Sequence, residues 1–306
     1  MTSIPRHALT SGGWPCGALA ELDRAVVMVD PGLLVNVNCP ADIVMSQAEG
    51  ASTFRVSGEA YDCFMGRYSR PLAGALANVA GIEPGQSALD VGCGPGALTG
   101  ELVRRLGAES VWAIDPSEPF VEACARRHPG VDVRHGRAEA LPYPDGRFDA
   151  ALAELVMHFV SDPPAAAREM RRVVRPGGAV AACVWDFAGG MRMLRLFWDA
   201  ALSVDPAAPD EAATLRFGRD GEIGELFTEA GLGEIVTGAL EVEASYEGFN
   251  DFWLPFLTGS GPAGSFCAAL DPERQAALRE ELRARLDSPE GPFTLPARAW
   301  YAVGRA

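Results

Sequence analysis

Short apolar runs alternate with amphipathic segments along most of the chain beyond residue 60. The apolar or alternating runs cover residues 88–91, 111–114, 131–135, 148–155, 179–184, 235–242 and 295–303. Segments with apolar residues at helical spacing lie between them, at residues 97–106, 119–127, 165–175 and 221–230. Buried strands alternating with amphipathic helices are typical of an α/β protein built on a largely parallel sheet.

The first apolar run opens directly into a turn with three alternating glycines. Residues 89–99 read Leu-Asp-Val-Gly-Cys-Gly-Pro-Gly-Ala-Leu-Thr, and a helical segment begins at residue 97. Glycine permits positive φ angles and lets the backbone approach a ligand closely. The first N–H groups of the following helix carry partial positive charge and attract anions or carboxylates. The stretch therefore predicts a ligand-binding turn.

Two classes of cofactor fit this turn. Gly92, Gly94 and Ala97 satisfy the relaxed dinucleotide fingerprint, and Asp115 follows the next strand at about the expected separation of roughly 20 residues. An NAD(P)-dependent oxidoreductase is therefore one interpretation. Two features favour a different interpretation of the turn. Asp90 stands before the first glycine, and Gly96 comes one place earlier than the last position of the dinucleotide fingerprint.

Four motifs in order resemble the class I S-adenosylmethionine-dependent methyltransferases, in particular the ubiquinone and menaquinone type that acts on small molecules. They are the glycine turn, Val-Trp-Ala-Ile-Asp-Pro-Ser at 111–117, the loop at 136–149, and Arg-Val-Val-Arg-Pro-Gly-Gly at 172–178. The resemblance implies a Rossmann-like, seven-stranded, mostly parallel sheet with helices on both faces and an antiparallel last strand. It also implies S-adenosylmethionine as cofactor and a small, partly apolar methyl acceptor that reacts by direct displacement.

The resemblance also assigns the cofactor contacts. The residues predicted to bind the cofactor are Asp90, Gly92, Cys93, Gly94, Gly96, Asp115, Pro116, Ala138, Glu139, Leu155 and Arg67. Asp115 is placed to accept hydrogen bonds from the ribose diol, and Arg67 to pair with the methionine carboxylate. Related proteins often have Asp where this chain has Arg137, so the adenine amino group needs Glu139 or a backbone carbonyl as acceptor.

The acceptor is expected at the end of the run at 148–155, because ligands of open α/β sheets bind beyond the carboxyl ends of the strands. Displacement at a sulfonium requires little from the protein beyond aligning the acceptor with the methyl group and excluding water. A base helps only if the acceptor loses a proton, and His158, Glu154 and Tyr61 are the candidates. A protein that binds S-adenosylmethionine without catalysis is a further interpretation.

The motifs divide the chain into six segments. These are a poorly structured extension at 1–50, a cofactor-binding core at 51–186, a lid insertion at 187–220, a continuation of the core at 221–245, a second lid segment at 246–294 and the last core strand at 295–306. Both lid segments are rich in aromatic residues. Most of these should pack between lid and core, and some should face the substrate.

Composition excludes several other classes of protein. The net charge of −15 disfavours a nucleic-acid partner, which needs a basic surface. The seven cysteines form no C-x-x-C pair, so the sequence predicts neither a disulfide framework nor a zinc site, and favours a cytoplasmic protein. No apolar run approaches the roughly 18 residues of a membrane span. The protein is expected to be a monomer or a homodimer.

Overall fold

The computed structural model describes residues 58–287 and 289–306, so the predicted extension at 1–50 lies outside the described residues. The described chain contains one seven-stranded sheet with the strand order β3-β2-β1-β4-β5-β7-β6. The strands are β1 (Ala88–Val91), β2 (Val111–Asp115), β3 (Asp132–His135), β4 (Phe148–Glu154), β5 (Val174–Trp185), β6 (Gly233–Tyr246) and β7 (Phe293–Arg305). The pairs among β1 to β5 are parallel, and β7 is antiparallel to both β5 and β6. The predicted fold class is confirmed.

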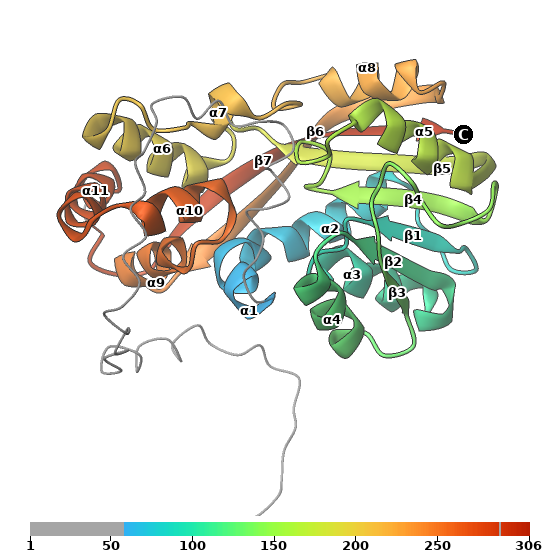
Figure 1. Cartoon of the computed structure of the whole chain (residues 1–306), viewed down its shortest axis with the longest axis horizontal. Coiled ribbons are helices and arrows are strands. Elements are labelled where there is room, and N and C mark those ends of the chain that lie inside the picture. Colours follow the sequence, from blue (N-terminus) through green and yellow to red (C-terminus); the bar gives the residue numbers. More distant parts are fainter. Residues whose placement is uncertain (1–57, 288) are drawn as a thin grey trace, which may run out of the picture. The chain divides into compact units, whose positions relative to one another are not determined.

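Helices flank this sheet on both faces (Figure 1). They are α2 (Arg67–Val79), α3 (Ala97–Leu106), α4 (Glu118–Arg127), α5 (Pro163–Val173) and α8 (Glu222–Glu229). In α2 the apolar positions Tyr68, Leu72 and Leu76 recur every four residues and are fully buried. That spacing places the three side chains on one helix face, which packs against the core. The helix α2 contacts α3, and α5 contacts α8.

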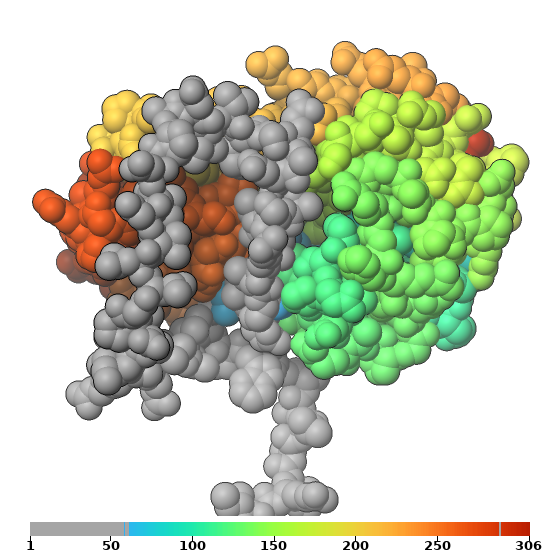
Figure 2. Space-filling view, in the orientation of Figure 1, coloured from blue at the N-terminus to red at the C-terminus, as the bar shows by residue number. Residues whose placement is uncertain are grey.

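A group of helices beyond the strands β5 to β7 makes up most of the two segments that the sequence predicts to be a lid, and we call this group the lid. It comprises α6 (Arg192–Val204), α7 (Glu211–Thr214), α9 (Phe249–Trp253), the 3₁₀ turn η5 (Leu254–Thr258), α10 (Gly261–Ala269) and α11 (Pro272–Arg285). In the space-filling view the yellow and red lid residues lie on one side and the green residues that follow the glycine turn lie on the other (Figure 2). Aromatic rings hold the lid together, since Phe197 stacks on Phe256 with centroids 4.5 Å apart. Such a stack adds to the apolar area that the two rings bury.

Two local expectations need correction. The predicted helix at 165–175 ends at Val173, and Pro-Gly-Gly at 176–178, which lies between that predicted helix and the predicted strand at 179–184, is part of β5. The glycines stay in the sheet because the Gly177 N–H donates to the Ala306 carbonyl at 2.9 Å and the Ala306 N–H donates to the Gly178 carbonyl at 3.1 Å. Pairing with the end of the chain therefore overrides the turn preference of the sequence.

The helical region before the first strand also differs from a plain helix. It begins as α1 (Gly58–Tyr61), widens into the π-helical segment η3 (Asp62–Gly66) and continues as α2. Single π-helical turns are often found at functional sites because they reposition side chains. No helix of the described ranges is long and apolar enough to cross a membrane.

Candidate functional site

The three glycines after β1 all have positive φ angles, but for different reasons. A Cβ atom at Gly92 would lie 2.4 Å from the Val156 side chain, and one at Gly96 would lie 2.7 Å from the His128 ring. At Gly94, where φ is +52°, a Cβ would meet nothing within 4 Å. Gly92 and Gly96 are therefore required by packing, whereas Gly94 faces open space that a ligand can enter.

Hydrogen bonds from neighbouring elements fix the shape of the turn. The Gly92 and Cys93 N–H groups donate to the Ile114 carbonyl at 2.8 and 3.0 Å. At the end of α4, Arg127 Nη1 donates to the Pro95 carbonyl and His128 Nε2 donates to the Gly96 carbonyl, each at 2.9 Å. The sequence did not single out these two basic residues, because cations in the last turn of a helix are usually surface residues.

Three buried carboxylates, those of Asp90, Asp115 and Glu154, line the cavity beside this turn. We call it the glycine-turn cavity; its lining includes Tyr61, Ser69, Asp90, Gly92, Cys93, Gly94, Asp115, Pro116, Glu154 and Leu155. Thr99 Oγ1 donates to Asp90 Oδ2 at 2.6 Å, but Asp90 Oδ1 and both Glu154 oxygens have no hydrogen-bond partner in the described part of the chain. Buried carboxylates without partners are costly, so the pair favours a positively charged ligand group.

Burial also shifts the protonation of both acids. It raises the pKa of Asp90 to about 7, with the nearby Asp115 charge acting in the same direction. It raises the pKa of Glu154 well above its usual range, and the charge of Asp90 adds to the shift. A cation bound between the two would oppose both effects and favour the ionised carboxylates.

Asp115 lies at the carboxyl end of β2 with both oxygens directed into hydrogen bonds. Its Oδ2 accepts from the Gly94 N–H and its Oδ1 from the Ser117 N–H, each at 2.8 Å. Burial raises its pKa to about 6. A carboxylate oxygen can accept more than one hydrogen bond, so the position that the sequence assigned to a ribose diol keeps acceptor capacity. Pro116 lines the same cavity.

Leu155 separates the glycine-turn cavity from a second cavity deeper under the lid. It is buried and has φ +60°, an unusual backbone conformation for a residue with a branched side chain. Strained backbone of this kind is concentrated at functional sites. Leu155, Tyr61 and Phe159 line both cavities, so the two spaces adjoin.

The second cavity is lined mainly by aromatic and apolar side chains, and we call it the aromatic cavity. Its lining comprises Tyr61, Phe64, Met65, Leu155, His158, Phe159, Trp185, Phe187, Leu194, Glu211, Gly261 and Pro262. The His158 ring lies 3.9 Å from the Phe159 ring and 5.3 Å from the Phe187 ring. Burial lowers the pKa of His158 to about 3, so its imidazole is neutral at pH 7. Its Nδ1 has no partner within the described ranges.

The structure separates the three candidate bases. His158 lines the aromatic cavity, whereas Glu154 lines the glycine-turn cavity with Asp90. Tyr61 lines both, but burial and the negative charges of Glu154 and Asp62 raise the pKa of its phenol far above neutrality. A phenol held neutral can donate a hydrogen bond but is a poor base. The geometry therefore leaves His158 as the base candidate on the aromatic side.

Arg67 lies beside an acidic residue of the lid, and its predicted contact with the methionine carboxylate stays a prediction. Its Nη2 forms a salt bridge with Asp251 Oδ1 at 3.0 Å, and its Nη1 donates to the Ser245 carbonyl at 2.8 Å. Its guanidinium also lies 4.3 Å above the Tyr246 ring. Arg67 therefore joins α2 to the lid. The sequence did not indicate this ion pair, because Asp251 is distant from Arg67 along the chain.

Glu139 holds the loop at 136–149 through backbone hydrogen bonds. Its Oε1 accepts the Ser161 N–H at 3.1 Å and the Asp162 N–H at 3.4 Å, and it lies 3.6 Å from Arg137. Ala138 is buried beside it. Neither Ala138 nor Glu139 is among the described residues that line the two cavities. Their predicted contacts with an adenine ring stay predictions.

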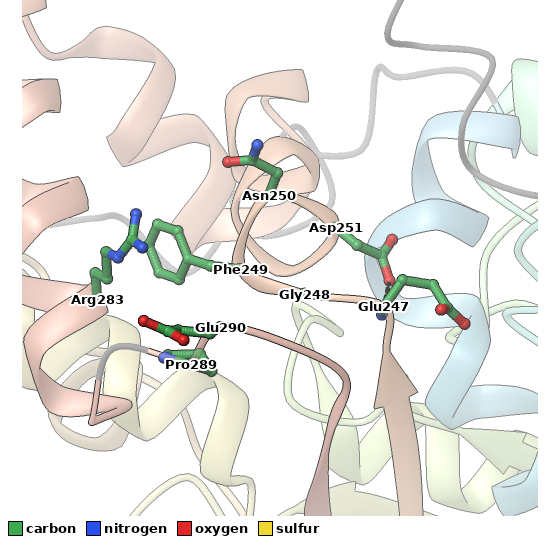
Figure 3. Close-up of a pocket in the computed structure, with 8 residues that line it drawn as sticks. All are labelled: Glu247, Gly248, Phe249, Asn250, Asp251, Arg283, Pro289 and Glu290. Atoms are coloured by element: carbon green, nitrogen blue, oxygen red, sulfur yellow. Dashed lines mark hydrogen bonds between the residues drawn. The ribbon is translucent and has the colours of Figure 1, made fainter.

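Another cavity lies between the end of β6, the start of α9 and the end of α11 (Figure 3). It is lined by Glu247, Gly248, Phe249, Asn250, Asp251, Arg283, Pro289 and Glu290. Figure 3 shows the Arg283 side chain beside the Phe249 ring, and its guanidinium lies 5.6 Å from the ring centroid. Asp251 is already paired with Arg67. None of the predicted site residues lines this cavity.

Comparison with known proteins identifies the family. Residues 89–182 match the methyltransferase domain family. Nocamycin O-methyltransferase of Saccharothrix syringae is 30% identical over 267 residues, which cover 80% of this chain and 94% of that protein. The chain belongs to the class I S-adenosylmethionine-dependent methyltransferases. It is an enzyme of this family, and the NAD(P)-dependent interpretation of the glycine turn is wrong.

Other relatives of this methyltransferase match over shorter spans or by fold. A 37.1 kDa protein of a Streptomyces fradiae transposon is 44% identical over 100 residues, so the chain spans only 29% of that protein. Among solved structures, phosphoethanolamine N-methyltransferase 2 of Haemonchus contortus, in complex with S-adenosylhomocysteine, has a TM-score of 0.54 at 15% identity. The match covers 86% of this chain and 60% of that one, and it shows a shared fold.

The residues of this methyltransferase fit S-adenosylmethionine. The cofactor carries a positive sulfonium and a positive α-ammonium group, and the glycine-turn cavity offers the unpartnered oxygens of Asp90 and Glu154. Ser69 contributes a buried hydroxyl without a partner among the described groups, which the sequence did not indicate. The open side of Gly94 leaves room for the cofactor beside the turn.

Proposed function

We propose that this methyltransferase acts on a small, partly apolar molecule bound in the aromatic cavity. The observation that carries the proposal is the direct junction of the two cavities at Tyr61, Leu155 and Phe159. One side offers carboxylates for the cationic cofactor, and the other offers an apolar enclosure with few polar groups. Pockets of the second kind are typical of small-molecule sites.

The proposed roles in the glycine-turn cavity follow from charge and geometry. Asp90 and Glu154 would hold the positive groups of the cofactor, and Asp115 its ribose hydroxyls. Gly94 would allow close approach of the backbone. When bound, S-adenosylmethionine supplies a methyl group that is already activated by the adjacent positive sulfur. The chain then has to align the acceptor with that methyl group and exclude water.

His158 is the group that we propose to accept a proton from the acceptor. As the acceptor oxygen gains the methyl group that the cofactor would supply, its hydroxyl proton would pass to His158 Nδ1. The unpartnered Nδ1 of this residue, which lines the aromatic cavity, supports the role. The name of the Saccharothrix syringae relative, an O-methyltransferase, supports an oxygen as the acceptor atom.

The function can be tested by screening small hydroxylated molecules for a mass increase of one methyl group, followed by a comparison of variants. We expect His158→Ala to lower turnover by about 10²-fold or more while the dissociation constant of S-adenosylhomocysteine stays within about twofold. Phe187→Leu, which alters the same wall without removing a proton acceptor, is the matched control. Wild-type turnover in His158→Ala would assign His158 to packing alone.

We also propose a cytoplasmic monomer or homodimer. Four cysteines of the described ranges, Cys93, Cys124, Cys183 and Cys267, are free thiols, which supports a reducing compartment. The acidic net charge supports small-molecule rather than nucleic-acid partners. Light scattering coupled to size-exclusion chromatography would give the oligomeric state.

A further inference from the structure

Glu211 is a charged group that the sequence did not bring to the site. It is the first residue of the lid helix α7, is only 3% exposed and lines the aromatic cavity. Trp198 Nε1 donates to its Oε2 at 2.7 Å, which fixes the carboxyl group in place. Burial raises the pKa of this carboxyl to about 7, so a large fraction is ionised near neutral pH.

Arg195, whose charge lowers the pKa of Glu211, pairs with other acids rather than with Glu211. Arg195 is held by two other acids, since its Nε lies 2.8 Å from Asp199 Oδ1 and its Nη1 lies 2.9 Å from Asp210 Oδ2. No arginine or lysine is among the described residues that line the aromatic cavity. The cavity therefore has a carboxyl group and no opposite charge.

Two further buried polar groups line the cavity without a partner among the described residues. They are the Trp185 Nε1–H, which can only donate a hydrogen bond, and His158 Nδ1. The rest of the lining is apolar, with Phe64, Phe159 and Phe187 among its aromatic walls. A buried polar group without a partner is costly, so the ligand should supply hydrogen bonds to these groups.

The lining of the aromatic cavity indicates which chemical groups the methyl acceptor should carry. An aromatic or conjugated ring fits the walls, and a hydroxyl group fits the polar groups, because it donates to Glu211 or His158 and accepts from Trp185. A carboxylate would meet the charge of Glu211 in a space of low polarity and would find no positively charged side chain among the described lining residues, so it should be rejected.

We propose that the acceptor is an uncharged ring compound bearing a hydroxyl group, and that Glu211 is the residue that excludes carboxylate acceptors from the aromatic cavity. This inference rests on the proposed function, since it assumes that the aromatic cavity holds the acceptor. Glu211 acts here by selecting the ligand.

The test compares two probes with the same ring, 2-naphthol and 2-naphthoate, which are neutral and anionic respectively near neutral pH. Their binding to the full-length protein saturated with S-adenosylhomocysteine is measured by calorimetry, so the readout does not depend on turnover. We expect wild type to bind 2-naphthol at least about tenfold more tightly than 2-naphthoate.

In Glu211→Gln the amide oxygen can still accept from Trp198, so the fold should be retained, which the melting temperature checks. We expect this variant to bind 2-naphthoate at least about tenfold more tightly than wild type does, with 2-naphthol changed by less than about threefold. Glu225→Gln, which removes the same charge at an exposed position of α8, is the matched control and should leave both affinities unchanged.

Any one of three results would overturn the inference. They are equal affinities for the two probes in wild type, binding of neither probe, and an unchanged preference between the probes in Glu211→Gln. The proposed function is judged separately. It fails if S-adenosylhomocysteine does not bind, or if no hydroxylated acceptor gains a methyl group, whatever the naphthyl probes do.

Discussion

Gly94 differs from the two glycines that flank it in what a side chain there would meet. A Cβ at Gly94 has no atom within 4 Å, whereas one at Gly92 or Gly96 would clash with a neighbouring side chain. If the cofactor fills the space at Gly94, a bulky side chain there should exclude the cofactor and leave the fold intact. We expect Gly94→Leu to weaken S-adenosylhomocysteine binding by at least about 10²-fold in calorimetry.

The control for that substitution is Gly81→Leu. Gly81 also has a positive φ, +70°, and no atom within 4 Å of a Cβ, so it imposes similar backbone strain of about 1–2 kcal/mol away from the cavity. Its affinity for S-adenosylhomocysteine should match wild type. Equal affinities in all three proteins would remove the glycine turn from the cofactor site.

The two carboxylates Asp90 and Glu154 predict a pH-dependent cofactor affinity. Burial raises the pKa of Asp90 to about 7, so the ligand-free protein holds a proton there that a bound cation should displace. Binding then releases protons, and the affinity for S-adenosylhomocysteine should rise about tenfold from about pH 6 to pH 8. Asp90→Asn keeps an acceptor for Thr99 but cannot titrate, so its profile should be flatter. A wild-type affinity that falls with pH would contradict the account.

The same shift affects the stability of the ligand-free protein. Folded Asp90 keeps its proton up to about pH 7, against 3.8 for an ordinary aspartate, so folding binds protons between these values and stability falls as pH rises. His158 has the opposite sign, because its pKa falls from 6.5 to about 3 and stability rises with pH between those values. Above about pH 6.5 the protonation of His158 no longer changes the stability with pH. The buried acids should therefore dominate the pH dependence of the stability there.

At the scale of elements, α2 and α9 are joined by a half-buried ion pair. Arg67 and Asp251 lie 3.0 Å apart, with side chains 18% and 20% exposed. We expect Arg67→Ala to cost about 1 kcal/mol, which corresponds to a fall of roughly 2–4 °C in melting temperature for a protein of this size.

The cofactor affinity of Arg67→Ala decides between the two roles of this residue. If Arg67 only joins the lid to the core, S-adenosylhomocysteine should bind within about twofold of wild type, and Asp251→Ala should lower the melting temperature by a similar amount. A loss of affinity of tenfold or more with an unchanged melting temperature would instead restore the predicted contact with the methionine carboxylate.

The elements were largely predictable because local signals and tertiary structure agree. The predicted helix at 97–106 matches α3 (Ala97–Leu106), since the glycine turn before it and Gly107 after it mark both ends. The predicted strand at 148–155 matches β4 (Phe148–Glu154) except for its last residue. Leu155 leaves the strand because its backbone adopts a positive φ, which nothing in the identity of a leucine indicates.

The site was predictable where a motif fixes the backbone and unpredictable where tertiary contacts decide. Asp90, Gly94 and Asp115 line the glycine-turn cavity because they lie at or just after the carboxyl ends of the adjacent parallel strands β1 and β2, which meet at one edge of the sheet. Glu211 reaches the aromatic cavity through the packing of a four-residue lid helix. No periodicity or spacing in the sequence encodes that position.

At the scale of the whole molecule, the core and the lid contribute residues to different cavities. The carboxyl ends of β1, β2 and β4 present the groups that we propose for the cofactor, and the lid helices α6, α7 and α10 contribute to the wall of the aromatic cavity, the proposed acceptor site. The core motifs match the family over residues 89–182, whereas Leu194, Glu211 and Pro262 lie outside that span. Cofactor choice is therefore set by the core, and we expect acceptor choice to be set by the lid.

The most direct test of the account is the thermal stability of the protein with S-adenosylmethionine, S-adenosylhomocysteine, NAD and NADP in parallel. A ligand that binds only the folded state stabilises it by about 2.7 kcal/mol at a concentration of 100 times its dissociation constant. The account predicts a higher melting temperature with S-adenosylmethionine and S-adenosylhomocysteine, and no change with NAD or NADP. Stabilisation by a nicotinamide cofactor, or by none of the four, would contradict it.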